Sequence, residues 1–179
     1  MRILFTGGSA CGKSTLAESI AARMPEPRYY VAAMIPRSSD DHRRVLRHQK
    51  HREGTGFVTI ERYTDIAGLN LPQGGTVLLE CLCHLTANEI FESNGAGTHA
   101  KQKILQGIEL LAQKADNLIV ITNDVSSDGL DYDEDVIFYV QTVGEINSEL
   151  AERFDCVCEM CCGIPLLLKG SLPEEFLSV

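Results

Sequence analysis

The segment Gly7-Gly8-Ser9-Ala10-Cys11-Gly12-Lys13-Ser14 decides which fold this chain can adopt. It has the form G-x-x-x-x-G-K-S, a glycine-rich turn whose backbone N–H groups can cradle phosphate oxygens. The apolar run Ile3-Leu4-Phe5 before it is typical of a buried strand, and residues 13–23 after it carry apolar side chains at helical spacing. A loop between a strand and a helix N-terminus is the setting that phosphate binding requires, because the helix dipole adds positive charge there.

Two side chains of this loop have expected roles in nucleotide chemistry. Lys13 would reach the β- and γ-phosphates of ATP or GTP, and the Ser14 hydroxyl would bind Mg²⁺. Glu80 ends the apolar run Val77-Leu78-Leu79 and is therefore a candidate for an acidic partner of the metal, directly or through water. The alternative for Glu80 is an exposed carboxylate at the end of a strand.

The composition is that of an ordinary globular protein, and it limits the classes of partner. Of the 179 residues, 44% are hydrophobic and 23% are charged, which is enough for one domain with a full core. The net charge of −9 argues against nucleic acid as the main partner but is compatible with bound nucleotides. No apolar run reaches membrane-spanning length and no signal peptide precedes the first strand, so we expect a cytoplasmic protein without an integral membrane segment.

Apolar runs alternate with helical patterns along the chain, which predicts an α/β fold with a mostly parallel sheet and helices on both faces. We expect one nucleotide-binding domain over residues 1–170 and a loosely held C-terminal tail over residues 171–179. Ligands in such sheets bind beyond the carboxyl ends of the strands. The loops expected at that edge follow Thr6, Ala33, Glu61, Glu80 and Thr122. The other expected strands are residues 28–33, 57–61, 76–80, 117–122, 154–160 and 165–168, and the expected helices are residues 100–115 and the later part of 134–153.

Residues 40–52 form a polar helix or loop that is rich in arginine and histidine, although the chain as a whole is acidic. Three interpretations stay open at this point. The segment could be a solvated cationic face, which is the usual fate of such a run. It could be a lid that neutralises a polyphosphate, or it could supply an imidazole as a nucleophile toward phosphorus, with neighbouring cations stabilising the transition state.

The cysteines indicate packing more than metal binding. Seven cysteines without a secretory signal favour reduced thiols or metal ligands over disulfides. Residues 156–162 hold four of them, but zinc sites commonly use a second, distant Cys-x-x-Cys pair, which this chain lacks. We therefore favour a strand there, with cysteine as a small apolar residue, and we expect Cys81 and Cys83 to pack in the core.

The acidic segment 124–135 resembles a calcium-binding loop in its spacing. Asp124, Ser126, Asp128, Gly129 and Asp135 match positions 1, 3, 5, 6 and 12 of an EF-hand loop. A buried strand precedes the segment where an EF-hand requires a helix, so we interpret it as a solvated acidic loop near the nucleotide.

Several segments in order make the chain similar to the bifunctional adenosylcobinamide kinase/adenosylcobinamide-phosphate guanylyltransferase family of cobalamin assembly. The similarity extends over roughly residues 1–170, and its ordered combination is more specific than the phosphate loop alone. The chain departs from the family pattern in the segment 123–129, where a proline is missing, and at Val140-Gln141, where an arginine and an aspartate are lost. The matching segments are residues 3–14, 30–33, 48–52, 57–61, 78–81, 121–125, 144–147 with 150–151, and 163–165 with Lys169.

This resemblance implies a fold, two reactions and a set of site residues. The sheet would be of the P-loop NTPase, RecA-like type, and the protein would be a homotrimer. The first reaction phosphorylates the aminopropanol hydroxyl of adenosylcobinamide from ATP or GTP, and the second attaches GMP from GTP to that phosphate through a guanylylated histidine. By motif position the nucleophile is His48, with His51 as the runner-up. The implied nucleotide contacts are Gly7, Gly8, Ser9, Ala10, Cys11, Gly12, Lys13, Ser14, Thr15, Ala33, Met34, Ile35, Gln49, Lys50, His51, Arg52, Glu61 and Glu80.

Two other functions are compatible with the same residues. A simpler P-loop kinase would use the histidine-rich segment only as a cationic clamp on another small hydroxylated substrate. A nucleotide-regulated binding protein would bind GTP without turnover.

Overall fold

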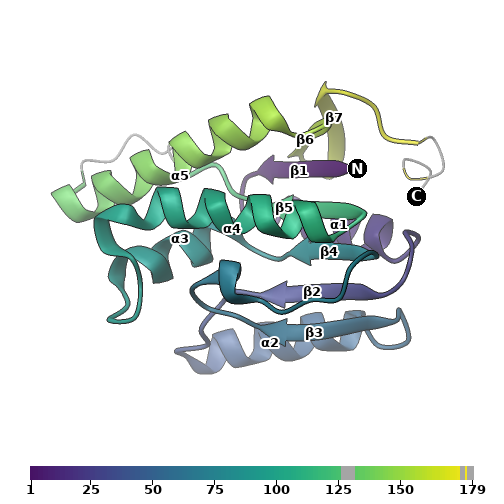
Figure 1. Ribbon diagram of the computed structural model, residues 1–179, viewed down its shortest axis with the longest axis horizontal. Coiled ribbons are helices and arrows are strands. Elements are labelled where there is room, and N and C mark those ends of the chain that lie inside the picture. Colours follow the sequence, from purple (N-terminus) through teal and green to yellow (C-terminus); the bar gives the residue numbers. More distant parts are fainter. Residues whose placement is uncertain (126–131, 174–175, 177–179) are drawn as a thin grey trace.

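Figure 1 shows the computed structural model, in which helices flank a seven-stranded sheet. It describes residues 1–125, 132–173 and 176, without the side chains of Arg44 and His51. The strand order is β3-β2-β4-β5-β1-β6-β7, with neighbours parallel except for the antiparallel pair β6 and β7. The strands are β1 (Arg2–Gly7), β2 (Arg28–Ala32), β3 (Phe57–Glu61), β4 (Thr76–Leu79), β5 (Asn117–Ile121), β6 (Cys156–Cys161) and β7 (Ile164–Lys169).

Helices cover both faces of the sheet, as the alternation of apolar runs predicts. One core contains Leu85, Ile104 and Ile146 from α3, α4 and α5, and the other contains Leu16 and Ile20 from α1. In Figure 1, α3, α4 and α5 lie in front of the sheet, and α1 and α2 lie behind it. The helices are α1 (Lys13–Ala21), α2 (Ser39–His51), α3 (Leu82–Phe91), α4 (Ala100–Lys114) and α5 (Glu134–Arg153), with short 3₁₀ turns η1 (Ile66–Gly68) and η2 (Gly97–His99).

The central strands are buried on both faces, because parallel strands between two helical layers have no solvent side. Leu4 of β1 is in register with Val120 of β5 and with Val157 of β6, and all three are buried. The phosphate loop follows β1, the segment before α2 follows β2, and α3 follows β4. Because these strands are parallel, their carboxyl ends bring the loop, α2 and α3 to one edge of the sheet.

The expected elements are largely confirmed, with two differences. The sequence patterns did not predict α3, and α5 is helical from Glu134 onward, where we expected only its later part. Within the tail, the side chains of Leu172 and Phe176 are buried against the core on the α1 side. The expected strand with cysteine as an apolar residue is confirmed as β6, where Cys156 and Cys158 are fully buried.

Local chemistry explains why the polar segment before β3 forms the helix α2. The Ser38 hydroxyl accepts a hydrogen bond from Asp41 N at 3.1 Å, and the Asp41 carboxylate accepts from Ser38 N at 2.9 Å. This reciprocal pair is a capping box, which satisfies backbone donors at the helix start.

Across the described ranges, no helix has both the length and the hydropathy that crossing a bilayer demands.

Candidate functional site

The loop between β1 and α1 adopts backbone conformations that favour glycine. Gly7 has a φ of +135°, and a Cβ there would lie 2.5 Å from the carbonyl oxygen of Met160 on β6. Gly12, the N-cap of α1, has a φ of +92°, and Ala10 also lies in the left-handed region. Lys13 is buried, and its Nζ donates to the carbonyl oxygen of Gly8 at 2.8 Å. The loop therefore curls over the N-terminus of α1, and the side chain of Lys13, the first residue of that helix, reaches back to the loop backbone.

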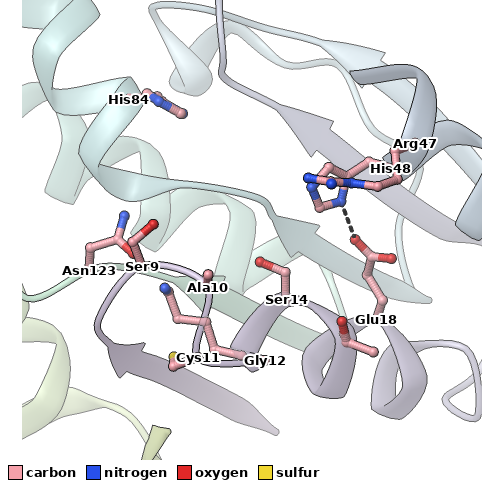
Figure 2. Close-up of a pocket in the computed structure, with 12 residues that line it drawn as sticks. Ser9, Ala10, Cys11, Gly12, Ser14, Glu18, Arg47, His48, His84 and Asn123 are labelled. Atoms are coloured by element: carbon pink, nitrogen blue, oxygen red, sulfur yellow. Dashed lines mark hydrogen bonds and ion pairs between the residues drawn. The ribbon is translucent and has the colours of Figure 1, made fainter. Parts of the chain in front are cut away.

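A cavity of about 520 Å³ opens in front of this loop (Figure 2), and we call it the phosphate cavity. Its other walls come from α1, α2, α3 and the segment that follows β5. In Figure 2, His48 and Arg47 lie at one end of the cavity and His84 lies at the other. The lining residues are Ser9, Ala10, Cys11, Gly12, Lys13, Ser14, Thr15, Glu18, Arg47, His48, His84 and Asn123.

His48 on α2 contacts the buried carboxylate of Glu18 on α1. Its Nδ1 lies 3.4 Å from Oε1 of Glu18, a residue that is only 8% exposed (Figure 2). Nη1 of Arg52 lies 3.7 Å from the same oxygen, and the Arg52 guanidinium carbon lies 3.4 Å from the centre of the Tyr30 ring. Such a contact fixes which nitrogen of an imidazole carries the proton, which leaves Nε2 as the other, basic nitrogen. The arrangement is suited to a nucleophilic imidazole that faces a phosphate.

A second, smaller cavity of about 40 Å³ adjoins the phosphate cavity at His48, and we call it the α2 cavity. Tyr63 OH donates to Oε2 of Glu61 at 2.7 Å, and burial together with this carboxylate raises the pKa of Tyr63 to about 12. Burial is also the main cause of the raised pKa of Tyr30, followed by the charge of Glu80. The α2 cavity is lined by Tyr30, Ala32, Met34, Pro36, Val45, His48, Gln49, Arg52, Thr59, Glu61, Tyr63 and Glu80.

The structure brings most of the expected site residues to these two cavities. Seven residues of the loop and His48 line the phosphate cavity, whereas Met34, Gln49, Arg52, Glu61 and Glu80 line the α2 cavity. The remaining ones lie elsewhere. Gly7 and Ala33 are buried, Gly8 and Lys50 are exposed, Ile35 lines a third cavity, and the side chain of His51 lies outside the described part of the chain.

Four residues of the phosphate cavity were missed by the sequence analysis: Glu18, Arg47, His84 and Asn123. Glu18 follows Ser14 by four residues and therefore lies on the same face of the helix. This spacing could have predicted that Glu18 belongs to the site. His84 lies on α3, the helix that the sequence patterns did not predict. Arg47 belongs to the cationic segment 40–52, and Asn123 begins the loop after Thr122 that was expected at this edge of the sheet. The sequence therefore indicated their neighbourhood, but the fold is what places their side chains next to the phosphate loop.

The described residues offer the phosphate cavity oxygen ligands but no dense metal cage. Within residues 1–125, 132–173 and 176, no three His, Cys, Asp or Glu side chains are grouped as metal ligands. Ser14 lines the phosphate cavity, whereas Glu80 lines the adjoining α2 cavity. Part of the acidic loop considered as a calcium site, residues 126–131, lies outside the described residues.

Comparisons with known proteins agree with this geometry. A solved ATPase of the type III secretion system of pathogenic bacteria has the same fold, with a TM-score of 0.57 at 13% identity over 98% of this chain, which spans 60% of that protein. A second solved structure, from Pyrococcus horikoshii OT3, has a TM-score of 0.51 at 9% identity over 97% of this chain and 88% of its own. These likenesses confirm the P-loop NTPase-like α/β fold.

Sequence comparison identifies the family. The chain is 26% identical to the bifunctional adenosylcobalamin biosynthesis protein CobP of Pseudomonas aeruginosa, over 95% of this chain and 98% of that protein. The model of the cobinamide kinase / cobinamide phosphate guanyltransferase family matches residues 3–168. The chain therefore belongs to the cobinamide kinase / cobinamide phosphate guanyltransferase family and is, with that family, a transferase.

Proposed function

We propose that this protein phosphorylates the aminopropanol hydroxyl of adenosylcobinamide and then transfers GMP from GTP to the new phosphate, through a guanylyl group on His48. The observation that carries the proposal is that His48 and the phosphate loop line one cavity of about 520 Å³. A single triphosphate held by the loop would therefore lie within reach of an imidazole. Nothing in a simple kinase mechanism requires a histidine at that place.

In the first reaction the acceptor hydroxyl oxygen attacks the γ-phosphorus of ATP or GTP. The new O–P bond forms as the bond to the β,γ-bridging oxygen breaks, the nucleoside diphosphate leaves with that electron pair, and the hydroxyl proton is released to water. The N–H groups of the loop and of the first turn of α1 would stabilise the phosphoryl oxygens. Lys13 would exchange its contact with the Gly8 carbonyl for the β- and γ-phosphates.

In the second reaction Nε2 of His48 attacks the α-phosphorus of GTP, and pyrophosphate leaves. An oxygen of cobinamide phosphate then attacks the same phosphorus, the P–N bond breaks, and the imidazole is restored. Glu18 would accept the Nδ1–H hydrogen bond throughout, and its charge would stabilise the positive imidazole of the adduct. Splitting the transfer in two replaces one difficult displacement by two easier ones.

The guanosine of the adduct would occupy the α2 cavity, because His48 belongs to both cavities. Glu61 has the chemistry to accept hydrogen bonds from the N1–H and N2–H₂ groups of guanine. At about 40 Å³ the α2 cavity is too small for a nucleoside, so the stacked pair of Arg52 and Tyr30 would have to separate or α2 would have to shift. We therefore expect GTP to rearrange this side of the site.

Mg²⁺ fits the oxygen donors of the phosphate cavity. Ser14 would hold the ion together with phosphate oxygens, and Glu80 would contribute through water from the adjoining α2 cavity. Bound there, the ion would neutralise charge on the triphosphate.

The fold also supports proposals on domain and assembly. The seven strands that the described residues form all join one sheet, so we propose a single nucleotide-binding domain over residues 1–170. The antiparallel strand β7 stands at the sheet edge with Ile164 62% exposed and Leu168 61% exposed. An apolar edge strand of this kind is the surface that a homotrimer would bury.

The test is incubation with GTP labelled on the α-phosphate. We expect a covalent adduct that acid releases, as a P–N bond requires, and that the substitution His48→Ala abolishes. The matched control is His42→Ala, because His42 is an exposed histidine on the same helix and should leave the adduct unchanged. Phosphorylation of cobinamide without any adduct would reduce the function to a kinase, and GTP binding without turnover would refute the enzymatic proposal.

A further inference from the structure

We propose that the third cavity, which lies between α3 and the segment leading into α2, binds the corrin ring of the acceptor. We call it the α3 cavity. This inference rests on the proposed function and assigns a place to its second substrate. The cavity measures about 340 Å³, and its walls include Met34, His84, Ala87 and Phe91. A cobinamide is larger than this volume, so the α3 cavity would hold one edge of the ring and leave the rest over the surface at Phe91.

Position is the first argument. The phosphate cavity shares one residue with each of its neighbours, His48 with the α2 cavity and His84 with the α3 cavity. Figure 2 places these two histidines at opposite ends of the phosphate cavity. In a displacement at phosphorus the incoming and leaving atoms lie roughly in line, so an acceptor that displaces His48 must approach from the far end. That end is the one at His84, where the α3 cavity opens.

Chemical character is the second argument. Phe91 is 52% exposed, which is unusual for a phenylalanine, and its only partner ring in the described part of the chain is Tyr139, with centroids 6.4 Å apart. Beside it, Arg37 and Glu92 form an ion pair that links the segment before α2 to the end of α3. A corrin ring presents methyl groups on its faces and amide arms at its rim. The aromatic face of Phe91 suits the methyl groups, and the charged pair suits the amides.

The wall of the α3 cavity is held in place before any ligand arrives. Nδ2 of Asn88 on α3 donates to the carbonyl oxygen of Ala33 at 2.8 Å and to that of Tyr63 at 2.9 Å. Asn88 is 7% exposed, so both hydrogen bonds are protected from water. They fix α3 against the loops after β2 and β3. A cavity with such support would bind a rigid ring with little rearrangement.

Two substitutions test the assignment by opposite physical changes. Phe91→Ala removes the exposed aromatic surface, and Ala87→Phe fills the cavity. Binding is measured by equilibrium dialysis, in which the absorbance of cobinamide gives its concentration on each side of the membrane. Activity is measured in two ways, as the KM for cobinamide and as adduct formation from labelled GTP. We expect both variants to weaken cobinamide binding at least tenfold while adduct formation stays within twofold of wild type. Val58→Ala is the matched control, because Val58 is also 52% exposed but lies on β3.

The outcomes separate this inference from the proposed function. If cobinamide binds both variants within twofold of wild type, the assignment is refuted whatever the activity. If the variants instead raise the KM for GTP, the cavity holds the nucleoside and the assignment is also refuted. If the wild type makes no adduct and no phosphocobinamide but binds cobinamide through Phe91, the assignment stands and the proposed function fails. If the wild type does not bind cobinamide, both are refuted.

Discussion

Replacing Glu18 by glutamine tests whether this buried carboxylate orients His48 and stabilises its guanylylated form. The substitution keeps the size of the side chain and removes its charge. Oε1 of Glu18 lies 3.4 Å from Nδ1 of His48, and the side chains are 10% and 21% exposed. The amide of glutamine can also present its N–H₂ group to the ring, which would favour the wrong tautomer.

The size of the effect follows from this geometry. Two unit charges 3.4 Å apart interact by roughly 5 kcal/mol at an effective dielectric constant of about 20. Arg52, 3.7 Å from the same oxygen, already offsets part of the carboxylate charge, and the contact to His48 is long for a hydrogen bond. A loss of about 2–3 kcal/mol is therefore expected, as for a hydrogen bond to a charged group. This corresponds to a roughly 30- to 150-fold slower attack.

The assay is single-turnover formation of the adduct from GTP labelled on the α-phosphate, followed by rapid quenching. Phosphorylation of cobinamide is measured on the same preparation, because Glu18 is expected to act on His48 and not on the γ-phosphoryl group. We expect the adduct rate to fall by the factor given above and the kinase rate to stay within threefold. Equal losses in both rates would show a merely structural role, and an unchanged adduct rate would refute the reasoning.

Three further predictions follow from other parts of the molecule. Lys13→Ala should lower phosphoryl transfer by roughly 100-fold or more, since it removes a cation from the developing phosphoryl charge, and near-normal turnover in a kinase assay would argue against the loop assignment. Ser38→Ala should lower the free energy of unfolding by about 1 kcal/mol, because it removes the cap of α2, and urea unfolding at neutral pH measures this loss. The Ser38 hydroxyl is the main cause of the lowered pKa of Asp41, so the stabilisation linked to this carboxylate is present above its unfolded pKa of about 3.8. The difference in the free energy of unfolding between Ser38→Ala and wild type should therefore become smaller as the pH falls through the lowered pKa of Asp41. Leu168→Lys should convert a homotrimer to smaller species in light scattering coupled to gel filtration, and an unchanged mass for a trimeric wild type would exclude β7 from the interface.

The fold was predictable from the sequence because each of its signals is local. The run Ile3-Leu4-Phe5, the glycines of the loop and the apolar spacing after Lys13 specify strand, turn and helix without reference to the rest of the chain. The strand β3 matches its expected bounds for the same reason. The helix α3 was not predicted because the usual signals of a helix start are missing. Cys81, its N-cap, makes no side-chain capping hydrogen bond, and its first turn holds no acidic residue.

The site was only partly predictable, because its walls depend on the order of the strands. Alternating strands and helices imply a parallel sheet, but many strand orders satisfy the same pattern. In this sheet β2 and β4 are neighbours, and α2 and α3 emerge after them at one edge. That order, and no sequence motif, places His48 and His84 at the two ends of one cavity. A shuffled order would keep the phosphate loop intact and lose the cavity, so a P-loop alone indicates nucleotide binding, and the strand order determines which side chains meet the nucleotide.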